Sequence, residues 1–354
     1  MVSPKTIASI LEDYEDLTIA TVCSHSSLQI FHGARQEGFK TLGIAIGKRP
    51  RFYDAFPLAK PDEFLVVDSY AEITDHADDL AARQAVTVPH GSFVEYMGSE
   101  NFRRFPVPTF GNREVLNWES DREKQRKWLE SAGIDMPHKI ARPEDIDRPV
   151  FVKYYGAKGG RGSFIAKNHD DFVEAIRPGM KYAIQEYIVG TRYYVHYFYS
   201  PLAEGGYRLS RGSLEMLGID RRDEANIDEM YKLGAQEALR KIGLYPTFVV
   251  TGNMPVVLRE SLLPTAFEMG ERVVERSKEL FGGMIGPFCL ETIVTDQLKF
   301  KVFEISTRIV AGTNLFISGS PYADMVEPGM STGRRIAREI RAGWKQGRLA
   351  EILS

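Results

Sequence analysis

Cysteine is scarce in this chain, which holds only Cys23 and Cys289 among 354 residues. Both lie in apolar segments typical of strands, so a disulfide framework is excluded and we interpret them as reduced core thiols. Long apolar runs are missing as well: nowhere do 18 apolar residues follow one another, and the N-terminus has no apolar signal core. The sequence therefore predicts no membrane span and no secretory signal, and we expect a cytoplasmic protein.

Charge of one sign is not in excess. The chain carries 45 Lys and Arg against 48 Asp and Glu, a net charge of −3, with both signs mixed along it. A nucleic-acid binder generally shows a basic patch, so the composition argues against nucleic acid as a partner. An anionic ligand must be met by local basic groups. With 43% hydrophobic and 26% charged residues, this is an ordinary globular composition, and the length predicts two or three domains.

Two common phosphate-binding motifs are absent. No Gly-x-x-x-x-Gly-Lys-Ser/Thr sequence occurs, which excludes a P-loop. A dinucleotide fingerprint would place glycines after the first strand, but the chain reads "CSHSSLQ" there. A nucleotide would have to be bound by another arrangement.

The first third of the chain alternates short apolar runs with helical patterns. Four buried strands are predicted at 18–23, 41–46, 63–68 and 84–89. The segment 27–38 predicts a helix that ends at Gly38. Buried strands separated by helical spacers are typical of a doubly wound parallel sheet, in which ligands bind beyond the carboxyl ends of the strands.

The remaining two thirds predict a mixed α+β organisation after the α/β beginning. We divide the chain into three predicted domains: 1–118 with the parallel sheet and the substrate site, 119–200, and 201–354. Helices are predicted at 119–133, 168–176, 261–281 and 333–347, and 134–149 is predicted as a connector. Strands are predicted at 149–156, 163–168, 182–190 and 193–200, with two more meeting at a polar turn at 295–297. We expect the basic helix at 333–347 to cover another domain or a second subunit of a homo-oligomer.

A glycine-rich stretch, "VFVKYYGAKGGRGSFIA" (150–166), interrupts two apolar runs. Glycines let backbone N–H groups approach phosphate oxygens, and basic side chains can close over the charge. The candidate phosphate-binding residues are Lys153, Gly156, Lys158, Gly159, Gly160, Arg161 and Gly162. Taken alone, the pattern fits a hairpin with solvated charges equally well.

Two glutamates interrupt apolar runs on the last pair of predicted strands. In an antiparallel hairpin that turns near 295–297, Glu291 and Glu304 fall opposite one another. Like charges side by side are destabilising unless a cation lies between them, and oxygen ligands suit Mg²⁺ or Mn²⁺ bridging to phosphates. The alternative is a solvent-facing pair on the polar side of the hairpin. On an extended strand, Ser306 and Arg308 share the face of Glu304, which adds a guanidinium to the site.

Hydroxyls and imidazoles follow two of the predicted parallel strands. Ser24-His25-Ser26-Ser27 opens the first helix, and "PHGSF" (89–93) repeats the arrangement with Gly91 expected to permit a turn and Ser92 at a helix start. Free N–H groups at a helix start suit a phosphate monoester. Capping of the helices by the serines is the competing interpretation.

Together these features resemble the ATP-grasp enzymes. The resemblance implies that Lys153 and the glycine loop cover the phosphates of ATP, that Glu291 and Glu304 hold the metal, and that Arg308 stabilises an acyl phosphate. It implies that the adenine lies against the segment Gln185, Glu186, Tyr187 and Ile188. The usual Glu-x-Asn-x-Arg motif reads Glu304-Ile-Ser306-Thr-Arg308 here, which weakens the third metal ligand. The expected ribose-binding acid is missing after "VGTR", and Glu224 is our substitute.

Longer strings, including "FGNREVLNWESDR", "VGTRYYVHYFYSP" and "VTGNMPVVLRESLLPTAFEMG", resemble the archaeal formaminoimidazole-carboxamide ribonucleotide (FAICAR) synthetases. That family implies an ATP-grasp ligase that formylates 5-aminoimidazole-4-carboxamide ribonucleotide (AICAR) with formate and ATP. It implies that His25, Ser92 and Asn253 contact the ribonucleotide, and we add Ser26 from its position. Two alternatives stay open: a ligase for another small acid or amine, and a relative that binds nucleotide without turnover.

Overall fold

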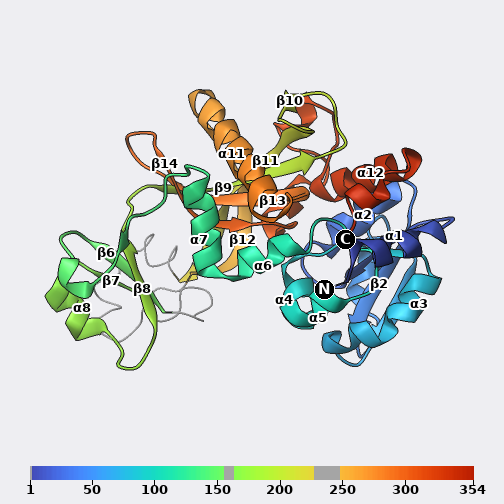
Figure 1. Ribbon diagram of the computed structural model, residues 1–354, viewed down its shortest axis with the longest axis horizontal. Helices are drawn as coiled ribbons and strands as arrows, with labels where there is room; N and C mark the ends of the chain where they lie inside the picture. The colour runs from blue at the N-terminus through green and yellow to red at the C-terminus, as the bar shows by residue number, and fades with distance from the viewer. Residues whose placement is uncertain (1, 155–162, 227–247) are drawn as a thin grey trace.

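Three sheets organise the described part of the chain (Figure 1). The computed structural model describes residues 2–154, 163–226 and 248–354. Figure 1 places both termini beside the first sheet, which shows that the chain returns at its end to the domain where it began.

The first sheet is parallel throughout, in the order β3-β2-β1-β4, so the doubly wound prediction is confirmed. Its strands are β1 (Thr18–Val22), β2 (Lys40–Ile46), β3 (Glu63–Val67) and β4 (Ala85–Thr87). The helices of this part are α1 (Pro4–Glu12), α2 (Ser27–Gln36), α3 (Ala77–Ala82), α4 (Gly91–Met97) and α5 (Ser99–Arg104). Every residue of β1 after Thr18 is buried, which explains its unbroken apolar sequence.

Two helices lead from the first sheet to the rest. These are α6 (Glu114–Ser120) and α7 (Arg122–Ser131). The prediction of one helix over 119–133 is wrong at its start, because Asp121 ends α6 and caps α7. Its carboxylate accepts hydrogen bonds from the N–H groups of Glu123 and Lys124, at 3.0 and 3.1 Å.

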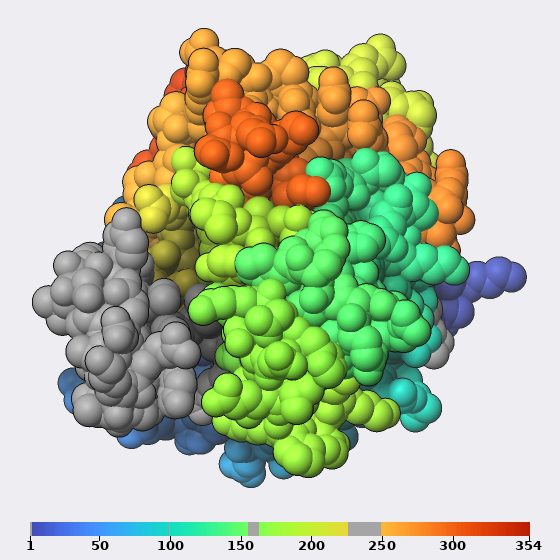
Figure 2. Space-filling view, turned by 90° about the vertical axis from the view of Figure 1, so that its left-hand side faces the viewer, coloured from blue at the N-terminus to red at the C-terminus, as the bar shows by residue number. Residues whose placement is uncertain are grey.

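A small antiparallel sheet follows, in the order β5-β8-β6-β7. It consists of β5 (Lys139–Ile140), β6 (Val150–Tyr154), β7 (Phe164–Ala166) and β8 (Tyr182–Glu186), with α8 (His169–Ala175) beside it. The predicted connector 134–149 therefore contains a strand. Asn168 caps α8 as predicted. Seen from its own side, this unit stands in front of the molecule with the β13–β14 turn above it (Figure 2).

The central sheet is antiparallel and has the order β10-β11-β9-β13-β14, with β12 paired to β11. Its strands are β9 (Thr191–Ser200), β10 (Tyr207–Arg208), β11 (Ser213–Asn226), β12 (Phe248–Pro255), β13 (Gly286–Val294) and β14 (Phe300–Ser306). Helix α11 (Leu263–Phe281) packs on it through a buried stripe that includes Ala266 and Val273. Strands β11 and β12 were not predicted: charged residues break the apolar pattern of β11, and Gly252 and Asn253 interrupt that of β12.

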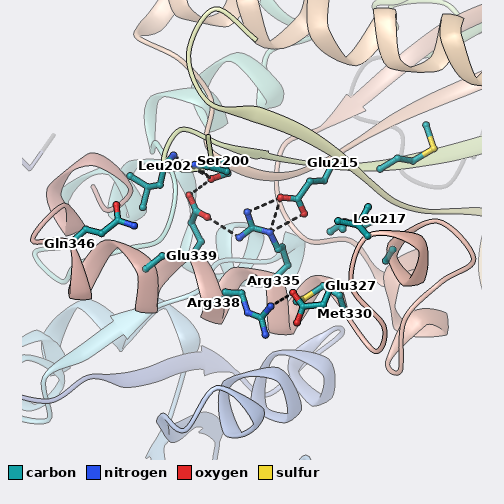
Figure 3. Close-up of a pocket in the computed structure, with 15 residues that line it drawn as sticks. Ser200, Leu202, Glu215, Leu217, Glu327, Met330, Arg335, Arg338, Glu339 and Gln346 are labelled. Atoms are coloured by element: carbon teal, nitrogen blue, oxygen red, sulfur yellow. Dashed lines mark hydrogen bonds and ion pairs between the residues drawn. The ribbon is translucent and has the colours of Figure 1, made fainter. Parts of the chain in front are cut away.

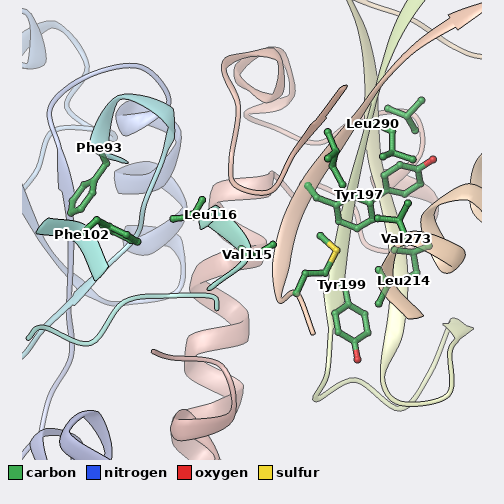
Figure 4. Packing of buried hydrophobic residues seen from close by; sticks show 14 of the residues in the cluster. Phe93, Phe102, Val115, Leu116, Tyr197, Tyr199, Leu214, Val273 and Leu290 are labelled. Carbon is green, nitrogen blue, oxygen red and sulfur yellow. The ribbon is translucent and has the colours of Figure 1, made fainter. Parts of the chain in front are cut away.

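One hydrophobic core runs from the first sheet to the central one. Figure 4 shows Phe93 and Phe102 on one side, Tyr197 and Leu290 on the other, with Leu116 of α6 between them. The last helix, α12 (Thr332–Lys345), lies against α2. The two backbones approach so closely that a Cβ at Gly33 would lie 2.2 Å from the N of Arg334. The basic helix thus covers the parallel-sheet domain, while the homo-oligomer stays a prediction.

Candidate active site

A row of polar side chains crosses one face of the central sheet. Asp220 of β11 is the Cα partner of Tyr194 on β9, Tyr194 is the partner of Glu291 on β13, and Glu291 is the partner of Glu304 on β14. Because directly opposed residues point to the same face of a sheet, these side chains line one surface. The two glutamates are opposed as the hairpin argument predicts.

The two carboxylates repel one another electrostatically. Desolvation by the protein groups around its carboxylate raises the pKa of Glu304 to about 7, and the neighbouring charge of Glu291 adds to the effect. The side chain of Glu304 is nevertheless exposed, whereas Glu291 is only 6% exposed. The pair is therefore a place where added positive charge is favourable and accessible.

Lys153 reaches the same place from β6 of the small sheet. Its ammonium lies 5.6 Å from the ring centre of Phe151 and 5.7 Å from that of Phe303. Burial lowers the pKa of Lys153, and the charge of Glu304 opposes that shift. A cation from one sheet and two carboxylates from another thus converge, as an ATP-phosphate site requires.

Arg222 of β11 is a residue that sequence analysis missed. Its guanidinium donates to both oxygens of Glu291, at 3.2 and 3.4 Å, and lies 3.5 Å from the centre of the Tyr194 ring. Burial alone would lower the pKa of Arg222, but Glu291 outweighs it and the pKa is raised. Ser306 also donates to Glu291, at 3.4 Å, so the hydroxyl in place of the usual asparagine belongs to the site.

The donor set fits a hard divalent cation. In the part of the chain that the structure describes, no three His, Cys, Asp or Glu residues form a metal-binding group. Mg²⁺ and Mn²⁺ sites in phosphoryl-transfer enzymes commonly use one or two carboxylates and complete the shell with phosphate oxygens and water. Glu291 and Glu304 supply such a pair.

The predicted substrate residues of the first domain converge at the ends of β1 and β4. The backbone N–H of Ser92 donates to Nε2 of His25 at 3.2 Å, and Nδ1 of His25 lies 3.1 Å from the hydroxyl of Ser26. Ser26 has a positive φ of 64°, uncommon for a residue with a side chain and typical of functional sites. His90 caps α4, accepting from Phe93 N–H at 3.3 Å.

Both histidines are neutral. Burial chiefly lowers the pKa of His25 to about 4, with Arg308 adding to the effect, and lowers the pKa of His90 to about 3, with His25 as the second cause. Both ring nitrogens of each have a partner, since Nε2 of His90 lies 3.0 Å from the carbonyl of Val22. Neither ring therefore has a nitrogen left over to act as a catalytic base.

This neutrality predicts the pH dependence of stability. An unfolded histidine binds a proton near pH 6.5, whereas His25 resists protonation down to about pH 4. The unfolded state therefore binds more protons between these values, and stability is lost as the pH falls through them. Between pH 7 and pH 5, we expect the free energy of unfolding to fall by about 2 kcal/mol less in His25→Gln than in the wild type. Thermal unfolding at both pH values measures this difference, and parallel curves for the two proteins would contradict it.

Arg308 joins the two ends of the site. A Cβ at Gly91 would lie 3.2 Å from Cζ of Arg308 and 3.1 Å from Nε2 of His25. The absence of a side chain at Gly91 therefore lets both groups pack close to the backbone there. Gly91 is the first residue of α4 and is not among the described glycines with positive φ, so a left-handed backbone is not the reason for a glycine there. Glu119, which sequence analysis missed, holds Arg308 by an ion pair of 2.9 Å and accepts from Thr307 N–H at 2.8 Å.

Comparisons with known proteins show the family to which the chain belongs. Two family models match, described as "Protein of unknown function (DUF1246)" over residues 19–140 and "Domain of unknown function (DUF1297)" over residues 173–354. Proteins named 5-formaminoimidazole-4-carboxamide-1-(beta)-D-ribofuranosyl 5'-monophosphate synthetase are 63% identical in Methanothrix thermoacetophila and 62% in Methanococcoides burtonii, each over the whole of both chains. This chain belongs to the FAICAR synthetase family.

Solved structures confirm the fold. The crystal structure of the IMP biosynthesis protein PurP from Thermococcus kodakaraensis is 32% identical with a TM-score of 0.73, and the match covers 95% of this chain and all of that one. A second match is the crystal structure of N5-carboxyaminoimidazole ribonucleotide synthetase from Thermotoga maritima, with 16% identity and a TM-score of 0.59. The match covers 93% of this chain and 76% of the synthetase chain. At this identity it shows only that the two proteins share a fold. The ATP-grasp prediction is therefore confirmed.

Other predicted ATP contacts of this FAICAR synthetase family member remain predictions. Gly156, Lys158, Gly159, Gly160, Arg161 and Gly162 lie outside the described residues. In the predicted adenine-binding segment, the N–H groups of Glu186 and Tyr187 donate to the carbonyls of His138 and Pro149, at 2.8 and 3.0 Å. An adenine edge would have to use other groups of the segment, which includes Gln185 and Ile188. Glu224 pairs with Arg192 at 3.0 Å.

Asn253 lies within β12 rather than in a turn. It is the Cα partner of Arg222, and its side-chain nitrogen donates to Asp220 at 2.7 Å. This places the predicted carboxamide contact one strand away from the guanidinium that binds Glu291. Asn253 and the predicted metal residues thus share one face of the central sheet.

A cavity of this synthetase lies elsewhere, between β11 and α12 (Figure 3). It measures about 290 Å³, and its charged groups bind one another: Arg335 pairs with Glu215 and Glu339, each at 2.8 Å. None of the predicted site residues lines it. Among the described helices, none is long and apolar enough to cross a membrane.

Proposed function

We propose that this chain catalyses ATP-dependent formylation of AICAR by formate, giving FAICAR, ADP and phosphate. The observation that carries the proposal is the position of Arg308. Its guanidinium contacts the His25 and Gly91 end of the parallel sheet, while Glu304, four residues earlier, faces Glu291 and Lys153. A ribonucleotide at one end and ATP at the other would meet at this arginine.

The residues suggest a two-step reaction. A carboxylate oxygen of formate attacks the γ-phosphorus of ATP, forming a P–O bond while the bond to the bridging oxygen of ADP breaks. The ring amine of AICAR then attacks the formyl carbon, phosphate leaves with the electron pair of the C–O bond, and the amine proton passes to phosphate or water. Lys153 and Arg308 stabilise the charge that develops on the transferred group.

Binding positions these reactants. A Mg²⁺ or Mn²⁺ ion, held by Glu291 and Glu304, would supply further charge neutralisation. At the other end, His25, Ser26 and Ser92 lie together and would hold the phosphate of AICAR. Asn253 would bind the carboxamide. Formyl phosphate hydrolyses readily, so the site has to exclude water during the second step.

The proposal is tested by leaving out one substrate at a time. Purified protein with Mg²⁺ and ATP should form ADP and FAICAR only when formate and AICAR are both present. Acetate and bicarbonate serve as competing acids in matched assays. Faster ADP formation with either of them would favour a different ligase, and no ADP formation under any condition would favour a protein that only binds nucleotide.

A further inference from the structure

A buried carboxylate lies directly behind Asn253. Asp220 has no exposed surface, and each of its oxygens has its own partner. Oδ1 lies 2.5 Å from Nε2 of His196, and Oδ2 accepts from Nδ2 of Asn253 at 2.7 Å. A Cβ at Gly312 would lie only 2.4 Å from Oδ1, so the backbone closes the remaining side. Burying a carboxylate is costly unless it is hydrogen-bonded in this way.

We infer that Asp220 is a positioning residue that fixes which end of the Asn253 amide faces the substrate. A carboxylate only accepts hydrogen bonds, so the amide nitrogen of Asn253 must turn toward Asp220. The carbonyl oxygen, Oδ1, then points away from Asp220 and accepts from a substrate N–H. This inference rests on the proposed function, in which Asn253 contacts the carboxamide of AICAR.

His196 holds the carboxylate in turn. It is 2% exposed, and on β9 it lies beside Gly218 of β11 and Cys289 of β13. Its hydrogen bond keeps Oδ1 of Asp220 occupied, which leaves Oδ2 for Asn253. The three side chains therefore form a line from the core to the substrate, and the orientation of the last is set by the first two.

This fixed orientation makes the site selective for a ligand that carries a hydrogen-bond donor opposite Asn253. The side-chain carbonyl of Asn253 accepts a hydrogen bond from an amide or amine N–H of the ligand. A ligand carboxylate in the same place has no N–H to donate, so that hydrogen bond is lost. The ribonucleotide bearing a carboxylate in place of the carboxamide should bind at least about 10-fold more weakly than AICAR.

Asp220→Asn is the direct test. The new amide offers a donor as well as an acceptor, so Asn253 loses its fixed orientation. We expect KM for AICAR to rise about 10- to 100-fold, with KM for ATP within about twofold of the wild type. If Asp220→Asn does not fold, Gly312→Ala, which pushes a methyl group against Oδ1, should give the same change in milder form. Glu215→Gln is the control: it breaks a half-buried ion pair on the same strand, away from the site, and should lower Tm without changing KM for AICAR.

A double-mutant cycle separates positioning from a structural role. If Asp220 acts through Asn253, then Asp220→Asn combined with Asn253→Ala should be no worse in KM for AICAR than Asn253→Ala alone. Multiplicative effects of the two changes, or a lower Tm with normal KM, would overturn the inference. Failure of the wild type to use AICAR would instead overturn the proposed function, and an unchanged ratio of the two ligands' affinities in Asp220→Asn would overturn the inference alone.

Discussion

Arg308→Met should lower kcat by about 1,000-fold while leaving the Kd of ATP within about threefold. The side chain lies between the His25 end of the site and the strand that carries Glu304, where charge develops during phosphoryl transfer. Methionine keeps the length and removes the charge and the donors. Rapid-mixing measurement of kcat and equilibrium binding of ATP together test the expectation.

Loss of an ion pair has to be separated from loss of catalysis. Arg308→Met also leaves Glu119 without its 2.9 Å partner, although Thr307 still donates to that carboxylate. Arg334→Met is a matched control, because Arg334 binds Glu37 at 2.8 Å at the C-terminal end of α2, whereas His25 precedes the start of that helix. It should lower Tm with kcat unchanged. A kcat above a tenth of the wild-type value in Arg308→Met would remove the proposed role.

Glu304→Gln should reduce ADP formation below about 1% of wild type and at the same time raise stability at pH 8. Folding makes this carboxyl harder to ionise, since desolvation and Glu291 raise the pKa of Glu304 to about 7 from an ordinary 4.5. The native state therefore loses stability as the pH rises through that window. Glutamine cannot ionise, so Glu304→Gln removes this loss of stability and also removes the predicted metal ligand. Tm with and without Mg²⁺ measures both effects: Mg²⁺ should stabilise the wild type and leave the variant unchanged.

The turn of the same hairpin offers the control for this change. Asp296 is exposed and lies outside the row of site residues, so Asp296→Asn should keep both the activity and the Mg²⁺ response. Normal ADP formation by Glu304→Gln would remove the metal assignment. A loss of activity with an undiminished Mg²⁺ shift in Tm would place the ion elsewhere.

The parts of the fold and site that depend on local pattern could be predicted from the sequence. The parallel strands are continuous apolar runs, and the turn at 295–297 fixes the register that opposes Glu291 and Glu304. Arg308 follows from the alternation of an extended strand. Each of these arguments uses residues within about fifteen positions of one another.

The missed residues depend on contacts between distant segments. Arg222 lies on β11, where "RRDEAN" has no apolar alternation and did not predict a strand. Glu119 meets Arg308 across 189 positions, and nothing in its neighbourhood distinguishes it from other helical acids. The contacts of Asp220 with His196 and Asn253 depend on the pairing of β11 with β9 and β12, which the sequence pattern does not predict. A charged residue in an otherwise apolar segment, such as Asp220 in "LGID", was the one available signal.

The most direct measurement follows the oxygen atoms of formate. With ¹⁸O-labelled formate, unlabelled ATP and AICAR, the account predicts one ¹⁸O atom in each phosphate released, because a formate oxygen becomes the bridge of the acyl phosphate. Mass spectrometry of the phosphate gives the answer. Phosphate without label, formed alongside FAICAR, would contradict transfer of the γ-phosphoryl group to formate.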